Sequence, residues 1–202
     1  MKFSLISSIR WSILISGITF VLAAIFSVSS TAILSDVEWF LGMVVVLILI
    51  LIGIFFDMIG LASAAAKETP FHAMAAEKVK GSKQGIQIIR NADRFSSISN
   101  DVIGDVTGVI SGAAVILVVG KLMEDYNSLN YTILSVSFTS LVSALTVGGK
   151  AIGKSFAIHY AETIVLFIGK IFYLLEHKLH ITVFKNKKKS NQGKRGTKGA
   201  TR

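Results

Sequence analysis

The run from Trp39 to Gly60 constrains the fold most, because it is apolar throughout except for Asp57 near its far end. As a helix rising ~1.5 Å per residue, a run of this length crosses the ~30 Å hydrocarbon core of a bilayer. Three more apolar segments approach the same length, at Trp11–Val28, Asp101–Leu122 and Tyr131–Val147. The chain is therefore predicted to be an all-α integral membrane protein with four transmembrane helices.

The first apolar segment has two interpretations. It follows a basic start with Lys2 and Arg10 and precedes the small residues 29–32, an arrangement that is also typical of a cleavable signal peptide. Its apolar part is longer than the ~7–15 residues of a usual signal sequence. This length favours an uncleaved span, and a signal peptide remains the alternative.

The composition agrees with a membrane protein, since 52% of the 202 residues are hydrophobic and 16% are charged. The chain has no cysteine, which excludes disulfides and thiolate metal sites. Much of the net charge of +9 lies in Lys185–Arg202, a stretch without acidic residues. This tail is predicted to be disordered and to bind anionic lipid head groups, with ~1 kcal/mol per basic residue near the surface. Because it has no interleaved aromatic residues to stack on bases, no nucleic acid partner is expected.

The connection Leu61–Ser99 is polar and rich in Lys and Arg, which predicts a cytoplasmic location. Placing this connection, the basic start and the basic tail on one side requires an even number of spans. Four spans satisfy that condition, so the prediction is a multi-pass protein of the inner (cell) membrane with both termini cytoplasmic. Within the connection, Ala73–Ile89 is predicted to be helical, and Ala161–Leu175 is predicted to form an interfacial amphipathic helix.

The third predicted span begins with an unusually polar and glycine-rich stretch, Asn100–Gly112. Carboxylates at membrane depth are costly, so Asp105 indicates an ion or proton site or a buried charge pair. The alternative is that the helix enters the bilayer only near Val106, which leaves the acids in the wet interface. The same alternative applies to Asp57. Gly104, Gly108 and Gly112 are four apart and are predicted to let another helix pack closely.

Residues Gly148–Ser155 match the phosphate-loop pattern Gly-x4-Gly-Lys-Ser, in which Lys154 would hold nucleotide phosphates. The pattern has meaning only between a buried strand and a helix. Here it follows a membrane-length apolar segment, so we interpret it as a chance match, and no enzymatic activity is predicted.

Four motifs occur in an order that resembles the transmembrane domain of the CNNM/CorB/CorC magnesium transporters, over about Val44–His180. They are Phe55-Phe56 with its small residues to Ala66, Ala75-Ala-Glu-Lys through Arg94-Phe95, Ile103-Gly104-Asp105, and Gly149-Lys150 through Lys154-Ser155 to Ala161-Glu162. The resemblance implies three spans with cytoplasmic juxtamembrane helices, a belt helix at about Ala161–Lys178, and a homodimer. It divides the chain into residues 1–38, a leading span and outside turn; 39–180, the CNNM-like domain; and 181–202, the tail.

The resemblance also implies a site for Mg²⁺ as the transported ion, and this chain departs from it. The family holds the ion with serines of its first span, the asparagine of Ile-Gly-Asn and the glutamate of Gly-Glu. At the matching positions this chain has residues 57–60, Asp105 and Lys150. Because Mg²⁺ needs near-octahedral oxygen ligands, these changes are expected to weaken or abolish the site. The oxygen-bearing candidates for a metal site are Asp57, Ser63, Asp105, Thr107 and Ser111.

Lys150 is predicted to be an intramembrane counter-ion, with its ammonium near Asp105 or Asp57 in place of the missing cation. The alternative is that Lys150 snorkels to the cytoplasmic interface. The leading functional prediction is CNNM-like transport or homeostasis of magnesium and other divalent cations with a degenerate site. The alternative is a non-transporting scaffold or regulatory partner subunit, with a relative that carries the CBS-pair domain as its partner.

Overall fold

The computed structural model describes residues 5–125 and 130–179, and within these ranges every regular element is a helix. Four helical stretches are long and apolar enough to cross a membrane: Ile9–Asp36, Trp39–Ala65, Ala92–Asp125 and Tyr131–His159. The prediction of an all-α chain with four membrane-length helices is confirmed. The predicted disordered tail, 181–202, lies outside the described residues.

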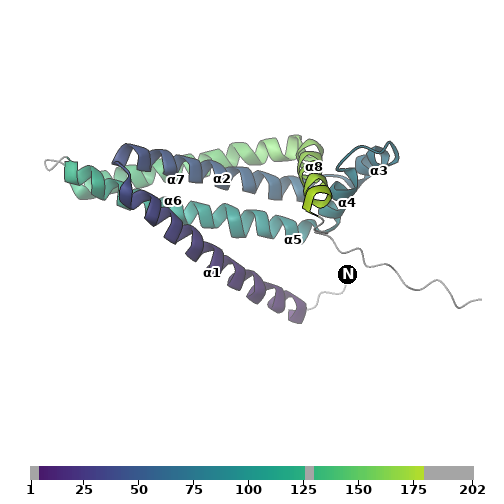
Figure 1. The fold of residues 1–202 in the computed structure, drawn as a ribbon, viewed down its shortest axis with the longest axis horizontal. Coiled ribbons are helices and arrows are strands. Elements are labelled where there is room, and N and C mark those ends of the chain that lie inside the picture. The colour runs from purple at the N-terminus through teal and green to yellow at the C-terminus, as the bar shows by residue number, and fades with distance from the viewer. Residues whose placement is uncertain (1–4, 126–129, 180–202) are drawn as a thin grey trace, which may run out of the picture.

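Three long helices form the bundle: α2 (Trp39–Ala65), α6 (Asp105–Asp125) and α7 (Tyr131–His159). They lie side by side along the long axis of the molecule (Figure 1) and contact one another pairwise. The first helix, α1 (Leu5–Asp36), packs on α6 near its C-terminal end and diverges from the bundle toward its N-terminus (Figure 1). None of its most apolar stretch is buried inside the chain, so this surface is available to lipid.

Short helices gather at one end of the bundle, where α2 and α7 end (Figure 1). They are α3 (Glu68–Ala76), α4 (Ser82–Arg90), α5 (Ala92–Ser97), the π-helix η1 (Ile98–Gly104) and α8 (Ala161–Leu179). The N-terminal end of α1 points to the same end, because the four long helices alternate in direction (Figure 1). All the connections that carry polar short helices are therefore at one end of the molecule.

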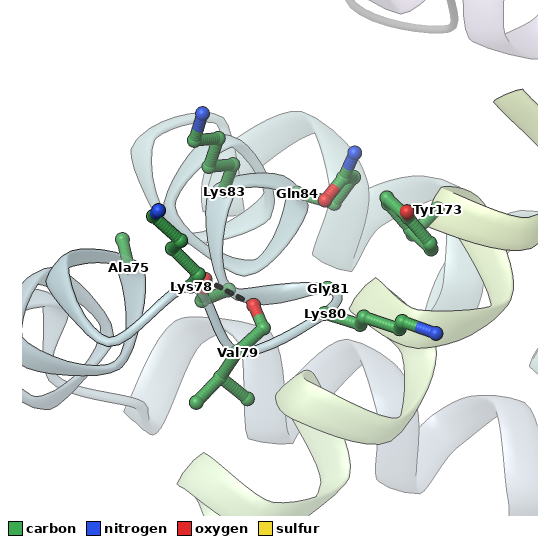
Figure 2. Close-up of a pocket in the computed structure, with 9 residues that line it drawn as sticks. Ala75, Lys78, Val79, Lys80, Gly81, Lys83, Gln84 and Tyr173 are labelled. Atoms are coloured by element: carbon green, nitrogen blue, oxygen red, sulfur yellow. Dashed lines mark hydrogen bonds between the residues drawn. The ribbon is translucent and has the colours of Figure 1, made fainter. Parts of the chain in front are cut away.

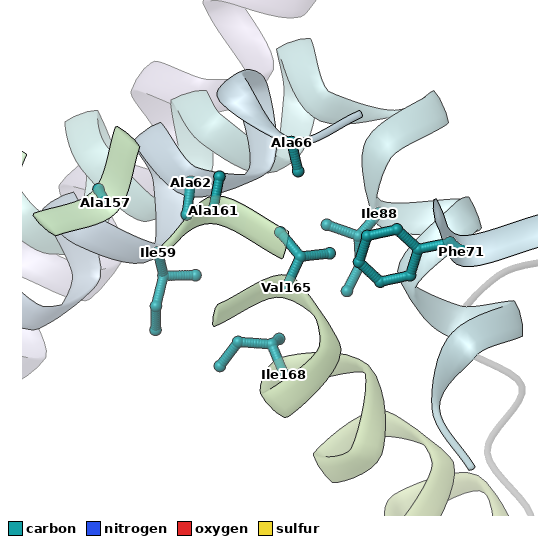
Figure 3. Packing of buried hydrophobic residues seen from close by; sticks show 9 residues of the cluster. All are labelled: Ile59, Ala62, Ala66, Phe71, Ile88, Ala157, Ala161, Val165 and Ile168. Atoms are coloured by element: carbon teal, nitrogen blue, oxygen red, sulfur yellow. The ribbon is translucent and has the colours of Figure 1, made fainter. Parts of the chain in front are cut away.

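An apolar cluster joins the short helices to the spans. Phe71 of α3 and Ile88 of α4 are almost completely buried and face Val165 of α8 (Figure 3). The cluster also takes in Ile59 of α2 and Ala157 of α7. Because one core contains side chains from α2, α3, α4, α7 and α8, the short helices have a defined position relative to the spans.

The predicted single helix over Ala73–Ile89 is wrong, because a turn at Glu77–Gly81 separates α3 from α4. Lys78, just after the end of α3, has φ 59°, and Gly81, the N-cap of α4, has φ 87°. Both values lie in the left-handed region, which a continuous helix cannot contain. A Cβ on Gly81 would lie 2.7 Å from the carbonyl carbon of Gly169, so α4 and α8 meet backbone to backbone here. Close packing against α8 therefore determines where the turn occurs.

The fourth span is longer than predicted. Helix α7 continues through the residues after Val147 and ends at His159, so Gly148–Ser155 is helical. A phosphate loop needs a preceding strand, and the described part of the chain contains none. Lys154 and Ser155 are therefore presented on a helix surface.

Glu68 joins α3 to α4 and makes the stability of this end dependent on pH. Arg90 donates to Glu68 Oε1 from Nε at 2.7 Å, and His72 Nε2 lies 2.8 Å from the same oxygen. The Arg90 hydrogen bond, followed by that of His72, lowers the pKa of Glu68 from its ordinary value of 4.5. A lowered pKa gives a contribution that is complete above about pH 4.5 and is lost as the pH falls through the folded-state value.

We therefore expect Glu68→Gln to be less stable than wild type at neutral pH, with a difference that disappears on acidification. The measurement is thermal unfolding of both proteins in neutral lipid nanodiscs, from neutral pH to well below pH 4.5. Glu77→Gln is the control, because Glu77 is exposed and forms no ion pair with a described residue. A Glu68→Gln difference that stays constant with pH would contradict the assignment.

Candidate functional site

The site is built around a π-helix at the start of the third span. Segment η1 ends at Gly104, and the amide of Asp105 donates to the carbonyl of Asn100, five residues back. Short π-helical stretches within longer helices are frequent at functional sites. The sequence analysis predicted a span that begins as a regular helix at Asp101. That prediction is corrected, because residues 98–104 form a π-helix with a different register.

Small residues let α2 approach this segment closely. A Cβ on Gly53 would lie 2.7 Å from Thr107 Oγ1 and 3.2 Å from the carbonyl oxygen of Gly104. A Cβ on Gly104 would in turn lie 3.4 Å from the Gly53 carbonyl oxygen. Of the predicted glycine strip, Gly104 packs in this way, whereas a Cβ added to Gly108 or Gly112 would have no atom of the described residues within 4 Å. The prediction of close packing therefore holds for Gly104 alone within this chain.

Four charged side chains from three helices meet beside this contact. Lys150 Nζ of α7 donates to Asp105 Oδ1 at 2.7 Å and lies 3.9 Å from Asp57 Oδ1 of α2. Lys154 Nζ, one turn further along α7, lies 3.9 Å from Asp57 Oδ2. Lys150 thus links the two carboxylates that the sequence analysis singled out, although 45 residues separate it from Asp105.

The four groups differ in their exposure. The side chain of Asp57 is 7% exposed and that of Lys150 is 18% exposed, whereas Lys154 is 55% and Asp105 is 65% exposed. Asp57 Oδ2 is buried and accepts no hydrogen bond from the described residues. Because a buried carboxylate costs several kcal/mol unless a cation compensates it, the largely buried Lys150 is the principal counter-ion of Asp57.

The structure also brings in two residues that the sequence analysis did not assign to the site. Lys154 appeared in the sequence analysis in the phosphate-loop pattern and in the fourth CNNM-like motif but was not assigned to the site, although its i, i+4 spacing from Lys150 places both on one helix face. Asn100 packs its side-chain amide against Gly60, where a Cβ would overlap it. Its Oδ1 is buried without a hydrogen-bond partner in the part of the chain that is described. No local sequence signal for Asn100 exists, because its position depends on the π-helical register.

The three hydroxyl-bearing candidates are buried and donate to their own helices. Ser63 Oγ donates to the Gly60 carbonyl at 2.7 Å, and Ser111 Oγ donates to the Gly108 carbonyl at 2.8 Å. Thr107 Oγ1 donates to the Ile103 carbonyl at 2.8 Å. Such bonds to the preceding turn satisfy a hydroxyl donor within an apolar environment. The three hydroxyl groups are therefore satisfied within their own helices, and none forms a hydrogen bond with Asp57 or Asp105.

The arrangement does not fit a resident Mg²⁺ ion. Mg²⁺ is held by near-octahedral oxygen ligands, whereas the nearest charged neighbours of both carboxylates are ammonium groups. Among the described residues, no group of three or more His, Asp or Glu side chains could hold a metal. Chemically, the site is a charge cluster between α2, α6 and α7 in which lysines neutralise two carboxylates.

No family model, curated protein or solved structure matches the chain. The resemblance to CNNM proteins therefore rests on the four ordered motifs.

Proposed function

We propose that the chain is a CNNM-like membrane protein of magnesium and divalent-cation homeostasis in which Lys150 takes the position of the transported cation. In this proposal it acts as a non-transporting regulatory partner subunit. The observation that carries the proposal is the Lys150 ammonium between the Asp105 and Asp57 carboxylates, at 2.7 and 3.9 Å.

The charge balance supports a cluster that excludes divalent ions. Two carboxylates and two ammonium groups sum to zero. Two unit charges 4 Å apart interact by ~4 kcal/mol at an effective dielectric constant of ~20. A divalent ion carries twice the charge, so at the same distance each lysine would repel it by about twice this energy. Entry of Mg²⁺ would therefore require Lys150 to move away from Asp105.

A second candidate is transport of a cation with Lys150 as a movable gate. It is favoured by the exposed Asp105 side chain and by Asp57 Oδ2, which has no hydrogen-bond donor among the described residues. Both carboxylates retain oxygen atoms that a permeating ion could coordinate once Lys150 has moved. The two candidates differ in whether the carboxylates bind a cation in the resting protein.

The proposed topology follows the positive-inside rule and places the short-helix end in the cytoplasm. Both termini then face the cytoplasm, in the inner membrane, with the basic tail on anionic lipid. A homodimer is proposed because Gly108 and Gly112 of α6 are open to the outside of this chain, and small residues let helices associate in a bilayer. A relative that carries the CBS pair is the proposed regulated partner.

The test is thermal unfolding of the full chain in neutral lipid nanodiscs, with and without millimolar Mg²⁺. We expect no rise in Tm beyond that produced by choline chloride of equal ionic strength, because ligand binding to the native state would raise it. An Mg²⁺-specific rise that Asp105→Asn abolishes would reject the non-transporting subunit and favour the gated transporter.

A further inference from the structure

The short-helix end contains a basic cavity that the charge cluster does not explain. The cavity has a volume of about 200 Å³ and lies where the α3–α4 turn meets α8. Lys78, Lys80 and Lys83 line it together with Tyr173 (Figure 2). Lys78 and Lys83 project from the turn and from α4, and Lys80 extends below the Tyr173 ring (Figure 2).

The three lysines have no acidic partner. All three are exposed, and none forms an ion pair with any residue in 5–125 or 130–179. The nearby acid Glu176 of α8 accepts a hydrogen bond from Gln84 at 2.7 Å. The three lysine side chains leave the rim of the cavity in different directions, Lys78 and Lys83 on one side and Lys80 on the other (Figure 2). Their charges make the rim positive without a compensating acid, and a multiply charged anion would be attracted to it.

The walls of the cavity are fixed by packing. Gly81 meets the backbone of α8 at Gly169 and Lys170, at distances that leave no room for a side chain. Ser82 is 1% exposed and donates from Oγ to the Val79 carbonyl at 2.7 Å. Because α8 and the turn are joined this closely, the lysines project from a rigid frame rather than from a free loop.

The cavity opens on the side of α8 that is opposite its apolar face. The exposed apolar side chains of α8 include Ile171, Leu174 and Leu175. Tyr173 is two residues from Ile171 and from Leu175, and at 3.6 residues per turn this places it on the other side of the helix. If the apolar face of α8 rests on lipid, the cavity faces water.

We propose that this cavity binds a phosphate-bearing anion from the aqueous phase. Phosphate is the chemistry that matches the cavity, because its several oxygens accept charge-assisted hydrogen bonds from several ammonium groups at once. A lipid head group offers the same chemistry, and the orientation of Tyr173 favours the soluble source.

The experiment is calorimetric binding of inorganic pyrophosphate to the full chain in phosphatidylcholine nanodiscs. The test variant carries Lys78→Gln, Lys80→Gln and Lys83→Gln. The control variant carries Lys67→Gln, Lys170→Gln and Lys178→Gln, which removes the same charge from exposed positions that do not line the cavity. Unchanged Tm values for both variants establish that each is folded. The basic tail is present in all three proteins, so any pyrophosphate that it binds contributes equally to the three titrations.

We expect the Kd for pyrophosphate to rise at least about tenfold in the test variant relative to wild type. The Kd of the control variant is expected to stay within about twofold of the wild-type value. Equal weakening in both variants would show binding by general charge and would overturn the site. A second arm repeats the wild-type titration in nanodiscs containing phosphatidylglycerol. If the wild type binds pyrophosphate with the same affinity in both kinds of nanodisc, the soluble source is supported. If phosphatidylglycerol weakens pyrophosphate binding to the wild type but not to the test variant, lipid head groups occupy the cavity, and the proposal is overturned.

Discussion

Replacing Lys150 with methionine is expected to destabilise the protein by about 3–5 kcal/mol, the cost of removing one partner of a buried ion pair. Methionine keeps most of the side-chain volume, so the loss reports the charge. The variant leaves the 7%-exposed Asp57 side chain with only the half-exposed Lys154 as a compensating cation. The measurement is equilibrium unfolding in lipid bicelles.

Lys154→Met is the matched control. It lies on the same helix at the same 3.9 Å from Asp57, but its side chain is 55% exposed. Exposed ion pairs contribute ~0–1 kcal/mol, so the control is expected to lose no more than that. Equal, small losses in both variants would mean that Lys150 is not the structural counter-ion of the site.

Gly53→Ala is expected to produce the second large effect, a loss of about 1–3 kcal/mol through overpacking. The added methyl group would lie 2.7 Å from Thr107 Oγ1 and 3.2 Å from the Gly104 carbonyl oxygen. Neither can withdraw easily, because Thr107 is hydrogen-bonded to Ile103 and the second atom belongs to the backbone. The change therefore forces α2 away from the start of α6, next to the charge cluster. It is measured by the same unfolding experiment.

Gly148→Ala in α7 provides the comparison, since its new methyl group would meet no described atom within 4 Å. Alanine is also the better helix former by ~1 kcal/mol, so this variant is expected to match or slightly exceed wild type. If Gly53→Ala and Gly148→Ala behave alike, the close contact between α2 and η1 does not exist as described.

The spans were predictable because hydrophobicity is a local property of the sequence. The runs containing Trp39–Gly60 and Tyr131–Val147 are apolar whatever surrounds them, and the structure has helices there. The idea that Lys150 approaches Asp105 came from the order of motifs and not from periodicity. The structure places these two side chains 2.7 Å apart.

The details that were missed depend on contacts between distant segments. The turn at Glu77–Gly81 forms where α4 meets the backbone of α8, and a propensity argument for a helix over Ala73–Ile89 contains no information about that contact. The π-helical register of η1 is likewise invisible to a 3.6-residue pattern. The position of Asn100 beside Gly60 follows from that register. Tertiary packing therefore determined what the local sequence could not.

The most direct test of the central claim is a double-mutant cycle between Lys150→Met and Asp57→Asn, measured by equilibrium unfolding in bicelles. If the Lys150 ammonium compensates the buried Asp57 carboxylate, Asp57→Asn will recover a large part of the stability that Lys150→Met loses. The coupling free energy is then expected to exceed about 1 kcal/mol. Additivity of the two substitutions within about 0.5 kcal/mol would contradict the claim that Lys150 occupies the cation position of this site.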